Sequence, residues 1–197
     1  MKSIPAVPAL PVCTSRRAAT ARPRGMTLVE MMTTLLIVGI VVGLGVPSFL
    51  RALARHAVMA QAEELQDAVR VGRSEAIKRG GPVVLCRTDA SNTSQCATAG
   101  GSWQTWLLFS DAGRNGVFGG ADALVRQHVD ASSRLTVVSS SASVRFESTG
   151  IAHADGGNAV FVLSPAGAGN GDRAAQRQVC VNPRGDVVVI AGDAACP

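Results

Sequence analysis

The longest hydrophobic pattern in the chain runs for twenty residues without a charge, from Met31 to Leu50, MMTTLLIVGIVVGLGVPSFL. This is about the length that an α-helix needs to cross the hydrocarbon core of a bilayer. Basic residues precede the run, so the positive-inside rule predicts a cytoplasmic N-terminus and places the chain after Leu50 outside the cytoplasm. A secretory signal peptide is the alternative, but the run is long for one and no A-x-A-like cleavage site follows it closely.

The helical pattern continues beyond Leu50 with an amphipathic spacing. Small and apolar residues recur at steps of three and four, the spacing of one helical face, while charged residues fall mostly between them. The residues of this face are Val58, Ala62, Leu65, Val69, Gly72 and Ala76. Gly80-Gly81-Pro82 is a stop signal, so we expect the helix to end near Arg79. Pro47 lies inside the helix and is expected to bend or loosen it.

After Pro82 the pattern changes to short runs rich in β-branched and aromatic residues, separated by Gly, Ser, Asn, Asp and Pro. Such alternation is typical of an antiparallel β domain. The expected strands are 83–86, 103–109, 123–129, 135–138, 143–147, 159–163, 177–181 and 186–191. The predicted fold class is therefore α+β: a long N-terminal helix, transmembrane in its first half, packed through its 58–76 face on an antiparallel β-sheet or sandwich.

The net positive charge of the chain comes from its N-terminal end. The formal charge is +5, yet the first 25 residues contain five basic residues and no acid, which leaves 14 basic and 14 acidic residues in the remainder. A neutral remainder offers few phosphate contacts, so the overall charge does not indicate nucleic-acid binding. Aromatic residues make up only 4% of the chain and Tyr is absent, which also disfavours a stacking platform for single strands.

A single carboxylate, Glu30, stands at the mouth of the apolar run, in the segment RGMTLVE from Arg24 to Glu30. An acid in an apolar segment is costly and usually has a partner or a function, although Glu30 alone is also explained by the interfacial edge of the helix. The whole string, a basic leader ending in Gly25, then Met26 to Glu30 and an apolar helix, resembles the type IV pilins and the type II secretion pseudopilins. In that superfamily a prepilin peptidase cuts after the Gly and methylates the new N-terminal amine.

The resemblance implies a role for three residues. Cleavage would follow Gly25, and Met26, where the superfamily commonly has Phe, would become the N-methylated first residue. Glu30 would neutralise a cationic N-terminus, its own or a neighbour's, when helices pack in a filament, because two charges that are costly in hydrocarbon are tolerated as a pair. The chain would then divide into a cleaved leader (1–25), a long helix (26–80) and a periplasmic β domain (81–197). The implied partners are other pilins or pseudopilins, the prepilin peptidase and the bacterial inner membrane.

Two later segments narrow the resemblance. The stretch WQTWLLFSDAGRNGVFGGADALVR, from Trp103 to Arg126, is similar to the GspH/FimT family of minor pseudopilins and minor pilins, in which an aromatic strand leads to an Asp-Asn-Gly loop and a Leu-Arg strand. QVCVNPRGDVVV is similar to the last hairpin of that family, with 182–185 as its turn. The implied function is that of a structural minor subunit in assembly of a type II secretion pseudopilus or a type IV pilus.

DNA capture during natural transformation is the alternative function. Some FimT-like minor pilins bind DNA through a Gly-Arg-x-Arg motif in the last hairpin. The aligned residues here are Gly185-Asp186-Val187-Val188, so both arginines are missing. A small patch of Arg173, Arg177 and Arg184 is the remaining candidate, but affinity for DNA needs several phosphate contacts.

The cysteines indicate disulfides. Cys13 lies in the leader, which leaves four cysteines in a domain expected to face the oxidising periplasm: Cys86, Cys96, Cys180 and Cys196. Of the three possible pairings we favour Cys86–Cys96 and Cys180–Cys196, because each closes a short loop. A zinc site is the rival, but no C-x-x-C spacing occurs and the three histidines are scattered.

Other patterns indicate no chemistry. The loop 111–116 lacks the dense oxygen ligands of a calcium site and is expected to be a solvated turn. The Gly-rich stretch 166–172 lacks the Lys of a phosphate-binding loop. His56, His128 and His153 have no Ser or Cys partner at an informative spacing. We therefore expect no cofactor, no metal and no enzymatic activity.

Overall fold

The computed structural model describes residues 25–89, 91–129, 134–155, 157–167 and 175–197. Within these ranges the chain forms one helix, α1 (Leu28–Arg79), followed by strands that pair only in antiparallel fashion. The strands are β1 (Val83–Asp89), β2 (Asn92–Cys96), β3 (Gly101–Ser102), β4 (Thr105–Ser110), β5 (Ala123–Val129), β6 (Leu135–Ser139), β7 (Ser143–Phe146), β8 (Ala152–Ala154), β9 (Ala159–Pro165), β10 (Arg177–Val181) and β11 (Val187–Ala191). The chain divides into two compact units, Met1–Leu44 and Gly45–Pro197.

Helix α1 begins in the first unit and ends in the second. It contains an 18-residue window with a mean hydropathy of 2.2, none of which is buried, so by length and composition it is able to span a membrane. The helix continues through Pro47, which has no N–H to donate and therefore leaves one carbonyl of the preceding turn without its helical donor. A bend at Pro47 stays a prediction.

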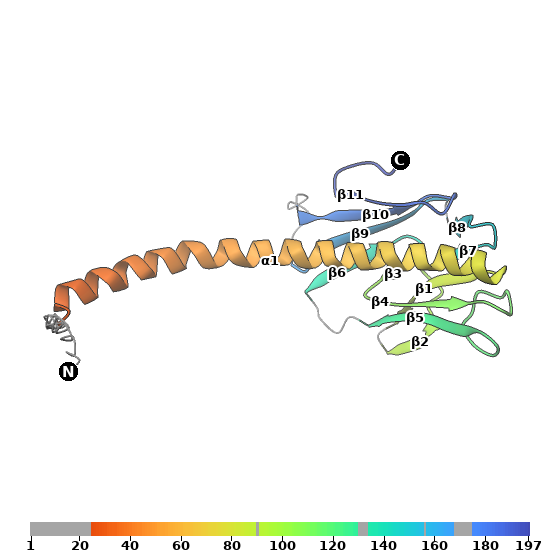
Figure 1. Ribbon diagram of the computed structural model, residues 1–197, viewed down its shortest axis with the longest axis horizontal. Coiled ribbons are helices and arrows are strands. Elements are labelled where there is room, and N and C mark those ends of the chain that lie inside the picture. Colours follow the sequence, from red (N-terminus) through yellow and green to blue (C-terminus); the bar gives the residue numbers. More distant parts are fainter. Residues whose placement is uncertain (1–24, 90, 130–133, 156, 168–174) are drawn as a thin grey trace, which may run out of the picture. The chain divides into compact units, whose positions relative to one another are not determined.

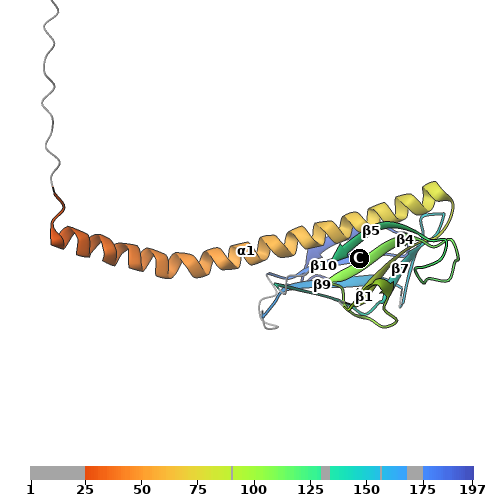
Figure 2. The ribbon, with the colours of Figure 1, turned by 90° about the horizontal axis from the view of Figure 1, so that it is seen from below.

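The strands of the second unit form two sheets. The first has the order β5-β4-β1-β7-β8, with β2 added beside β1, and the second has the order β11-β10-β9-β6-β3. The later part of α1 lies against both sheets, with β10 and β11 along one flank and β4 and β5 along the other (Figures 1 and 2). The expected helix packed on antiparallel sheets is thus confirmed.

The core lies between α1 and the two sheets. All six residues of the expected helical face are buried, together with Ala68, which the sequence pattern did not single out. Apart from Gly72, they form one apolar cluster with Phe146 of the first sheet, Phe161 of the second, and Trp103, which lies between β3 and β4. The small residues on this face allow close approach: a Cβ on Gly72 would lie 2.9 Å from Cε2 of Phe146.

The first sheet is buried on both faces. Alternate residues of β1 and β4 face α1, and the others form a second cluster of Val84, Cys86, Leu107 and Phe109, with Cys96 and Phe118 packed against it. This double burial explains why the sequence reads as the continuous apolar runs VVLC and WLLF rather than as an apolar–polar alternation.

All eight expected strands are present, with small shifts of their ends. The expected strand 103–109 is corrected at its start, because β4 begins at Thr105 and Trp103 precedes it. The ring of Trp103 instead fills the core. Strands β2, β3 and β8 were not predicted. Their two to five residues are mostly polar or small, and they are held by pairing with neighbours rather than by an apolar pattern of their own.

Candidate functional site: the helix surface and the last hairpin

The start of α1 is capped by a side chain that the sequence analysis did not single out. The backbone N–H of Glu30 donates to Oγ1 of Thr27 at 3.3 Å, and the N–H of Met31 donates to the carbonyl of Thr27 at 3.2 Å. Thr27 is therefore the N-cap, and the T-x-x-E spacing of a capping box was the signal that could have found it. Glu30 lies in the first helical turn, where the positive end of the helix dipole favours a carboxylate.

The apolar side chains of the early part of α1 are exposed. Among the described residues nothing covers them: Leu28 is 74% exposed, Leu36 66% and Leu44 75%. A soluble monomer rarely exposes so continuous an apolar surface, and such a surface normally contacts lipid or another protein. We call the exposed residues from Met26 to Leu53 the apolar helix surface.

In the second unit the turn of the last hairpin has a defined geometry. The N–H of Gly185 donates to the carbonyl of Asn182 at 2.9 Å, and Oδ1 of Asn182 accepts from the N–H groups of Arg184 and Asp186 at 3.0 Å each. Gly185 has a φ of 79°, a value that favours glycine. The expected turn at 182–185 is therefore present between β10 and β11.

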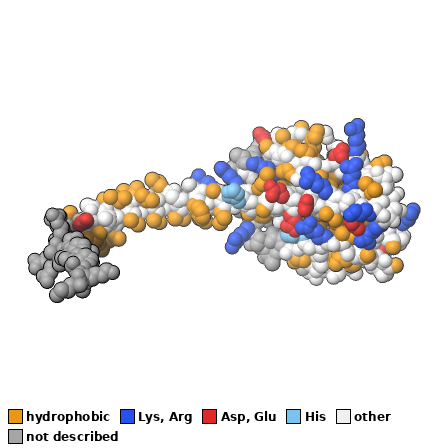
Figure 3. Space-filling model, in the orientation of Figure 1, with side chains coloured by type: hydrophobic (Ala, Val, Ile, Leu, Met, Phe, Trp, Pro, Cys, Tyr) orange, Lys and Arg blue, Asp and Glu red, His pale blue; other side chains and the backbone are white. Residues whose placement is uncertain are grey.

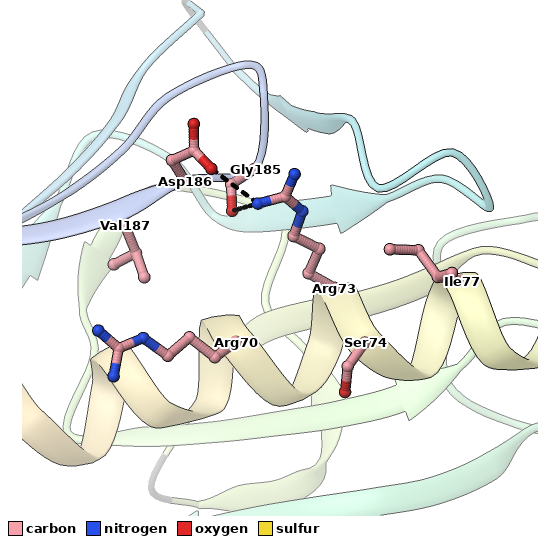
Figure 4. Close-up of a pocket in the computed structure, with 7 residues that line it drawn as sticks. All are labelled: Arg70, Arg73, Ser74, Ile77, Gly185, Asp186 and Val187. Atoms are coloured by element: carbon pink, nitrogen blue, oxygen red, sulfur yellow. Dashed lines mark hydrogen bonds and ion pairs between the residues drawn. The ribbon is translucent and has the colours of Figure 1, made fainter.

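Arg73 ties this turn to α1. Its Nη1 donates to Oδ1 of Asp186 at 2.7 Å and to the carbonyl of Gly185 at 3.4 Å, as Figure 4 shows. The two side chains are 37% and 58% exposed, so we expect the pair to contribute at most about 1 kcal/mol to stability. An open recess of about 310 Å³ lies beside the pair, lined by Arg70, Arg73, Ser74, Ile77, Gly185, Asp186 and Val187.

A second polar contact fixes the opposite flank of α1. Nδ1 of His128 lies 2.9 Å from Oε1 of Glu64, Nη2 of Arg126 lies 3.6 Å from the same oxygen, and the His128 ring stacks on Trp106 at 5.4 Å. His128 is a residue of β5, so its contact with Glu64 joins α1 to that strand. None of these contacts is with a nucleophile such as Ser or Cys. Near the end of the helix, the hydrogen bond from Arg79 holds the pKa of Glu75 below its ordinary value.

Replacing Gly185 with Ala should loosen the hairpin from the helix. The new Cβ would collide with the carbonyl oxygen of Gly150, and the positive φ would be strained for Ala. We expect the free energy of unfolding to fall by about 1–3 kcal/mol. Chemical denaturation of the full chain in detergent measures this. Gly119→Ala is the matched control, because nothing lies within 4 Å of its added Cβ; equal effects of the two substitutions would contradict the role of Gly185.

The structure contains both favoured disulfides. Cys86 joins Cys96 with a Cα–Cα distance of 5.5 Å, and Cys180 joins Cys196 at 5.8 Å. The first ties β2 to β1, and the second attaches the C-terminal tail to β10. Cys13 lies outside the described residues. Among the described residues no cluster of three His, Cys, Asp or Glu side chains is present that could hold a metal.

The expectation of a solvated turn at 111–116 is corrected at its first residue. Asp111 is fully buried, and its carboxylate accepts from the N–H groups of Asn115 at 3.0 Å and Gly116 at 2.8 Å. The carboxylate thus serves the loop backbone as an internal acceptor, which explains the Asp-x-x-x-Asn-Gly spacing without an ion.

The candidate DNA-binding arginines are not adjacent where they are described. Arg177 is the first residue of β10 and Arg184 lies in the turn beyond its other end. The strand alone separates their backbones by about 13 Å. Arg173 lies outside the described residues, as does most of the Gly-rich stretch 166–172.

Comparison with known proteins agrees with the arrangement of helix and sheets. The family model described as "Type II transport protein GspH" matches residues 61–185, and a model of the prokaryotic N-terminal methylation motif matches residues 20–46. No match was found among the curated proteins.

Solved structures of a minor pilin share the fold. Two crystal structures of the type IV minor pilin FimU of Pseudomonas aeruginosa PAO1 match with TM-scores of 0.50 and 0.52 at 17% and 18% identity, and they cover 70% and 72% of this chain and 96% and 94% of theirs. The minor pseudopilin EpsH of the Vibrio cholerae type 2 secretion system gives a TM-score of 0.47 at 14% identity, over 70% of this chain and 98% of that one.

The two family models together cover the start of α1, its buried face from Ala62 onward, strands β1 to β10 and the turn of the last hairpin. The family consists of structural subunits of the pilin and pseudopilin class rather than of enzymes. Because the GspH model spans more than half of the sequence, the chain belongs to the GspH family of minor pilins and pseudopilins.

Proposed function

We propose that the chain is processed and built, as a minor subunit, into a type II secretion pseudopilus or a type IV pilus. The observation that carries the proposal is the joint presence of the methylation-motif segment, Glu30 in the first turn of α1 and the apolar helix surface that follows. An apolar surface of this size, with a carboxylate at its N-terminal end, is suited to contact lipid before assembly and neighbouring helices after assembly.

Processing begins at the leader. The prepilin peptidase cuts after Gly25 and methylates the amine of Met26, which leaves the mature chain starting one residue before the N-cap Thr27. The five basic residues of the leader keep the N-terminus in the cytoplasm, and residues 81–197 form the β domain in the periplasm. Two disulfides in that domain fit an oxidising compartment.

The carboxylate of Glu30 then pairs with an N-terminal amine. Met26 and Glu30 are four residues apart, or about 6 Å along a helix. A carboxylate at that distance is able to pair with its own N-terminus or with that of an adjacent helix. Inside a filament or a bilayer the pair is far less costly than either charge alone.

The test uses a bacterium that has both a type II secretion system and type IV pili. The chromosomal copy is deleted and a tagged full-length copy is supplied. We expect the tagged chain in sheared or purified filaments, with loss of either secreted substrates or pili in the deletion strain. The affected machine identifies the assembly in which the chain works. Normal secretion and normal pili, with the tagged chain absent from both filaments, would contradict the proposal.

DNA binding is not expected. The hairpin turn presents Asp186, whose carboxylate is paired with Arg73, where the DNA-binding motif has an arginine. In electrophoretic mobility shifts with short duplexes the wild type should behave like an R177Q/R184Q variant, because a neutral domain releases few counterions. Tight binding that weakens steeply with salt and is lost in the double variant would contradict this expectation.

A further inference from the structure

Basic side chains follow the end of the apolar run on α1. Arg51 and Arg55 come directly after Leu50, and the helix carries no acid from Met31 to Ala62. Both arginines are exposed, and among the described residues their side chains have no hydrogen bond or ion pair. Figure 3 shows basic side chains, in blue, around the helix where its apolar stretch, in orange, ends. This part of α1 therefore carries a positive charge that the described residues do not neutralise.

An open groove of about 450 Å³ lies at the same level of the helix, within the second unit. Its lining residues are Leu50, Leu53, Ala54, Ala57, Arg134 and Ala166. The four helix residues follow one another at spacings of three, one and three, so they share one face of α1. We call this feature the juxtamembrane groove, because the apolar helix surface ends in it.

The two walls of the juxtamembrane groove differ in character. On the helix wall the side chains are apolar, and Leu50 and Leu53 are 57% and 51% exposed. The other wall consists of Arg134, which directly precedes β6, and Ala166, which directly follows β9. The carbonyl of Arg134 accepts from the N–H of Ala166 at 2.8 Å, so these two strand ends are joined. The side chain of Arg134 is exposed and has no partner among the described residues, which leaves its guanidinium available to a ligand.

The groove falls at the level of the lipid headgroups. A run of twenty uncharged residues matches the hydrocarbon core of a bilayer, so Leu50 marks the edge of that core. From Leu50 to Ala57 the helix rises about 10 Å, and the headgroup layer is roughly 5–7 Å thick on each side. This step rests on the proposed function, because it takes α1 to be inserted in the bilayer with the β domain in the periplasm. In that position the groove opens among phospholipids.

We propose that the juxtamembrane groove binds an anionic phospholipid of the periplasmic leaflet. The lipid phosphate lies on the guanidinium of Arg134, whose planar fork of donors fits a phosphate. The first carbons of an acyl chain lie along Leu50 and Leu53. A free phosphate would leave this apolar wall in water, which is the reason for naming a lipid as the occupant.

The charge of the lipid follows from the charges around the groove. Arg51, Arg55 and Arg134 supply three cations, and no carboxylate lies on the adjacent part of α1. The ammonium of a zwitterionic headgroup would therefore meet like charge without a partner. An anionic headgroup is attracted by each arginine at the membrane surface.

A lipid in this groove has a role once the leader is removed. Cleavage after Gly25 takes five basic residues from the cytoplasmic end of the helix, whereas Arg51 and Arg55 stay at its periplasmic end. The mature chain then has the reverse of the charge pattern that directs insertion. An anionic headgroup neutralises the periplasmic arginines. Because the groove has one wall on α1 and the other on strand ends of the β domain, the same lipid holds that domain at the membrane surface.

The test is native mass spectrometry of the full chain, expressed with a prepilin peptidase and purified in detergent. Dioleoylphosphatidylglycerol or dioleoylphosphatidylcholine is added at equal concentration. We expect the chain to bind phosphatidylglycerol about fivefold more tightly, and Arg134→Gln should abolish this preference, because one arginine near an anionic lipid is worth about a factor of five. Ala54→Phe fills the groove without changing its charge and should lower the binding of both lipids.

The control separates the groove from general surface charge. Arg114→Gln removes another exposed arginine whose side chain has no partner among the described residues, and it should leave the lipid preference unchanged. Equal binding of the two lipids by the wild type would overturn the proposal, and so would an Arg134→Gln variant that keeps the preference. Displacement of the lipid by millimolar inorganic phosphate would assign the groove to free phosphate and overturn it as well.

Failure of the groove and failure of the proposed function are distinguishable. Each comparison is between variants with the same N-terminus, so an uncut leader changes the background and not the difference. An uncut chain that prefers phosphatidylglycerol through Arg134 would contradict the proposed function and keep the groove. A chain with methylated Met26 in filaments but without the lipid preference would remove the groove alone.

Discussion

Glu30→Ala should be cleaved and inserted normally yet enter filaments poorly. Insertion loses nothing when a charge is removed from the edge of an apolar span. In the filament, however, the amine of Met26 would lose its carboxylate, and an uncompensated charge in an apolar setting costs about 3 kcal/mol or more, roughly a hundredfold in an equilibrium. The ratio of the tagged chain in sheared filaments to that in membranes, measured by quantitative immunoblotting, gives the effect.

Two further variants make this test specific. Glu30→Gln keeps the shape and hydrogen-bonding capacity but not the charge, so it should resemble Glu30→Ala. Asp193→Ala removes an exposed carboxylate without a partner among the described residues and should behave like the wild type. Incorporation of Glu30→Ala at the wild-type level would show that the carboxylate has no part in assembly.

Trp103→Ala should destabilise the β domain by about 3–5 kcal/mol. The side chain is fully buried, its ring packs edge-to-face on Phe161 at 4.7 Å, and its Nε1 donates to the carbonyl of Ser141 at 2.9 Å. The substitution leaves both a cavity and an unpaired carbonyl. Because the processing segment lies in the other compact unit, the variant should still be cleaved after Gly25. Urea unfolding in detergent measures the loss of stability.

The second tryptophan provides the matched comparison. Trp106 is equally buried, but its Nε1 has no hydrogen-bond partner among the residues that the structure describes. Trp103→Phe loses a hydrogen bond, typically worth about 1 kcal/mol, whereas Trp106→Phe removes an unsatisfied donor. We therefore expect Trp103→Phe to be the more destabilising of the two. The opposite order, or a Trp103→Ala variant as stable as the wild type, would contradict the role assigned to Trp103 in the core.

The sequence predicted the features that depend on local periodicity. The face from Val58 to Ala76 is visible because helical spacing and burial coincide, and the stop at Gly80-Gly81-Pro82 agrees with the observed end at Arg79. Strands β1 and β4 were found because burial on both faces makes them continuously apolar. The disulfide pairings followed from loop length and compartment.

Features that depend on distant partners could not be predicted. The Arg73–Asp186 pair joins residues 113 positions apart, and Glu64 meets His128 across 64 positions, so no local pattern marks either contact. The burial of Asp111 arises from the fold around it, since its own loop sequence is polar. Strand β2 lacks an apolar alternation and depends on β1 and on the disulfide of Cys96.

The N-terminus of the mature chain tests the central claim most directly. The full-length chain is co-expressed with a prepilin peptidase, and its intact mass and N-terminal peptide are determined by mass spectrometry. The account predicts a product that begins at Met26 and carries one methyl group on its amine. An uncut chain, or one cut beyond Leu50, would contradict the account, because the amine that Glu30 is proposed to neutralise would then not exist.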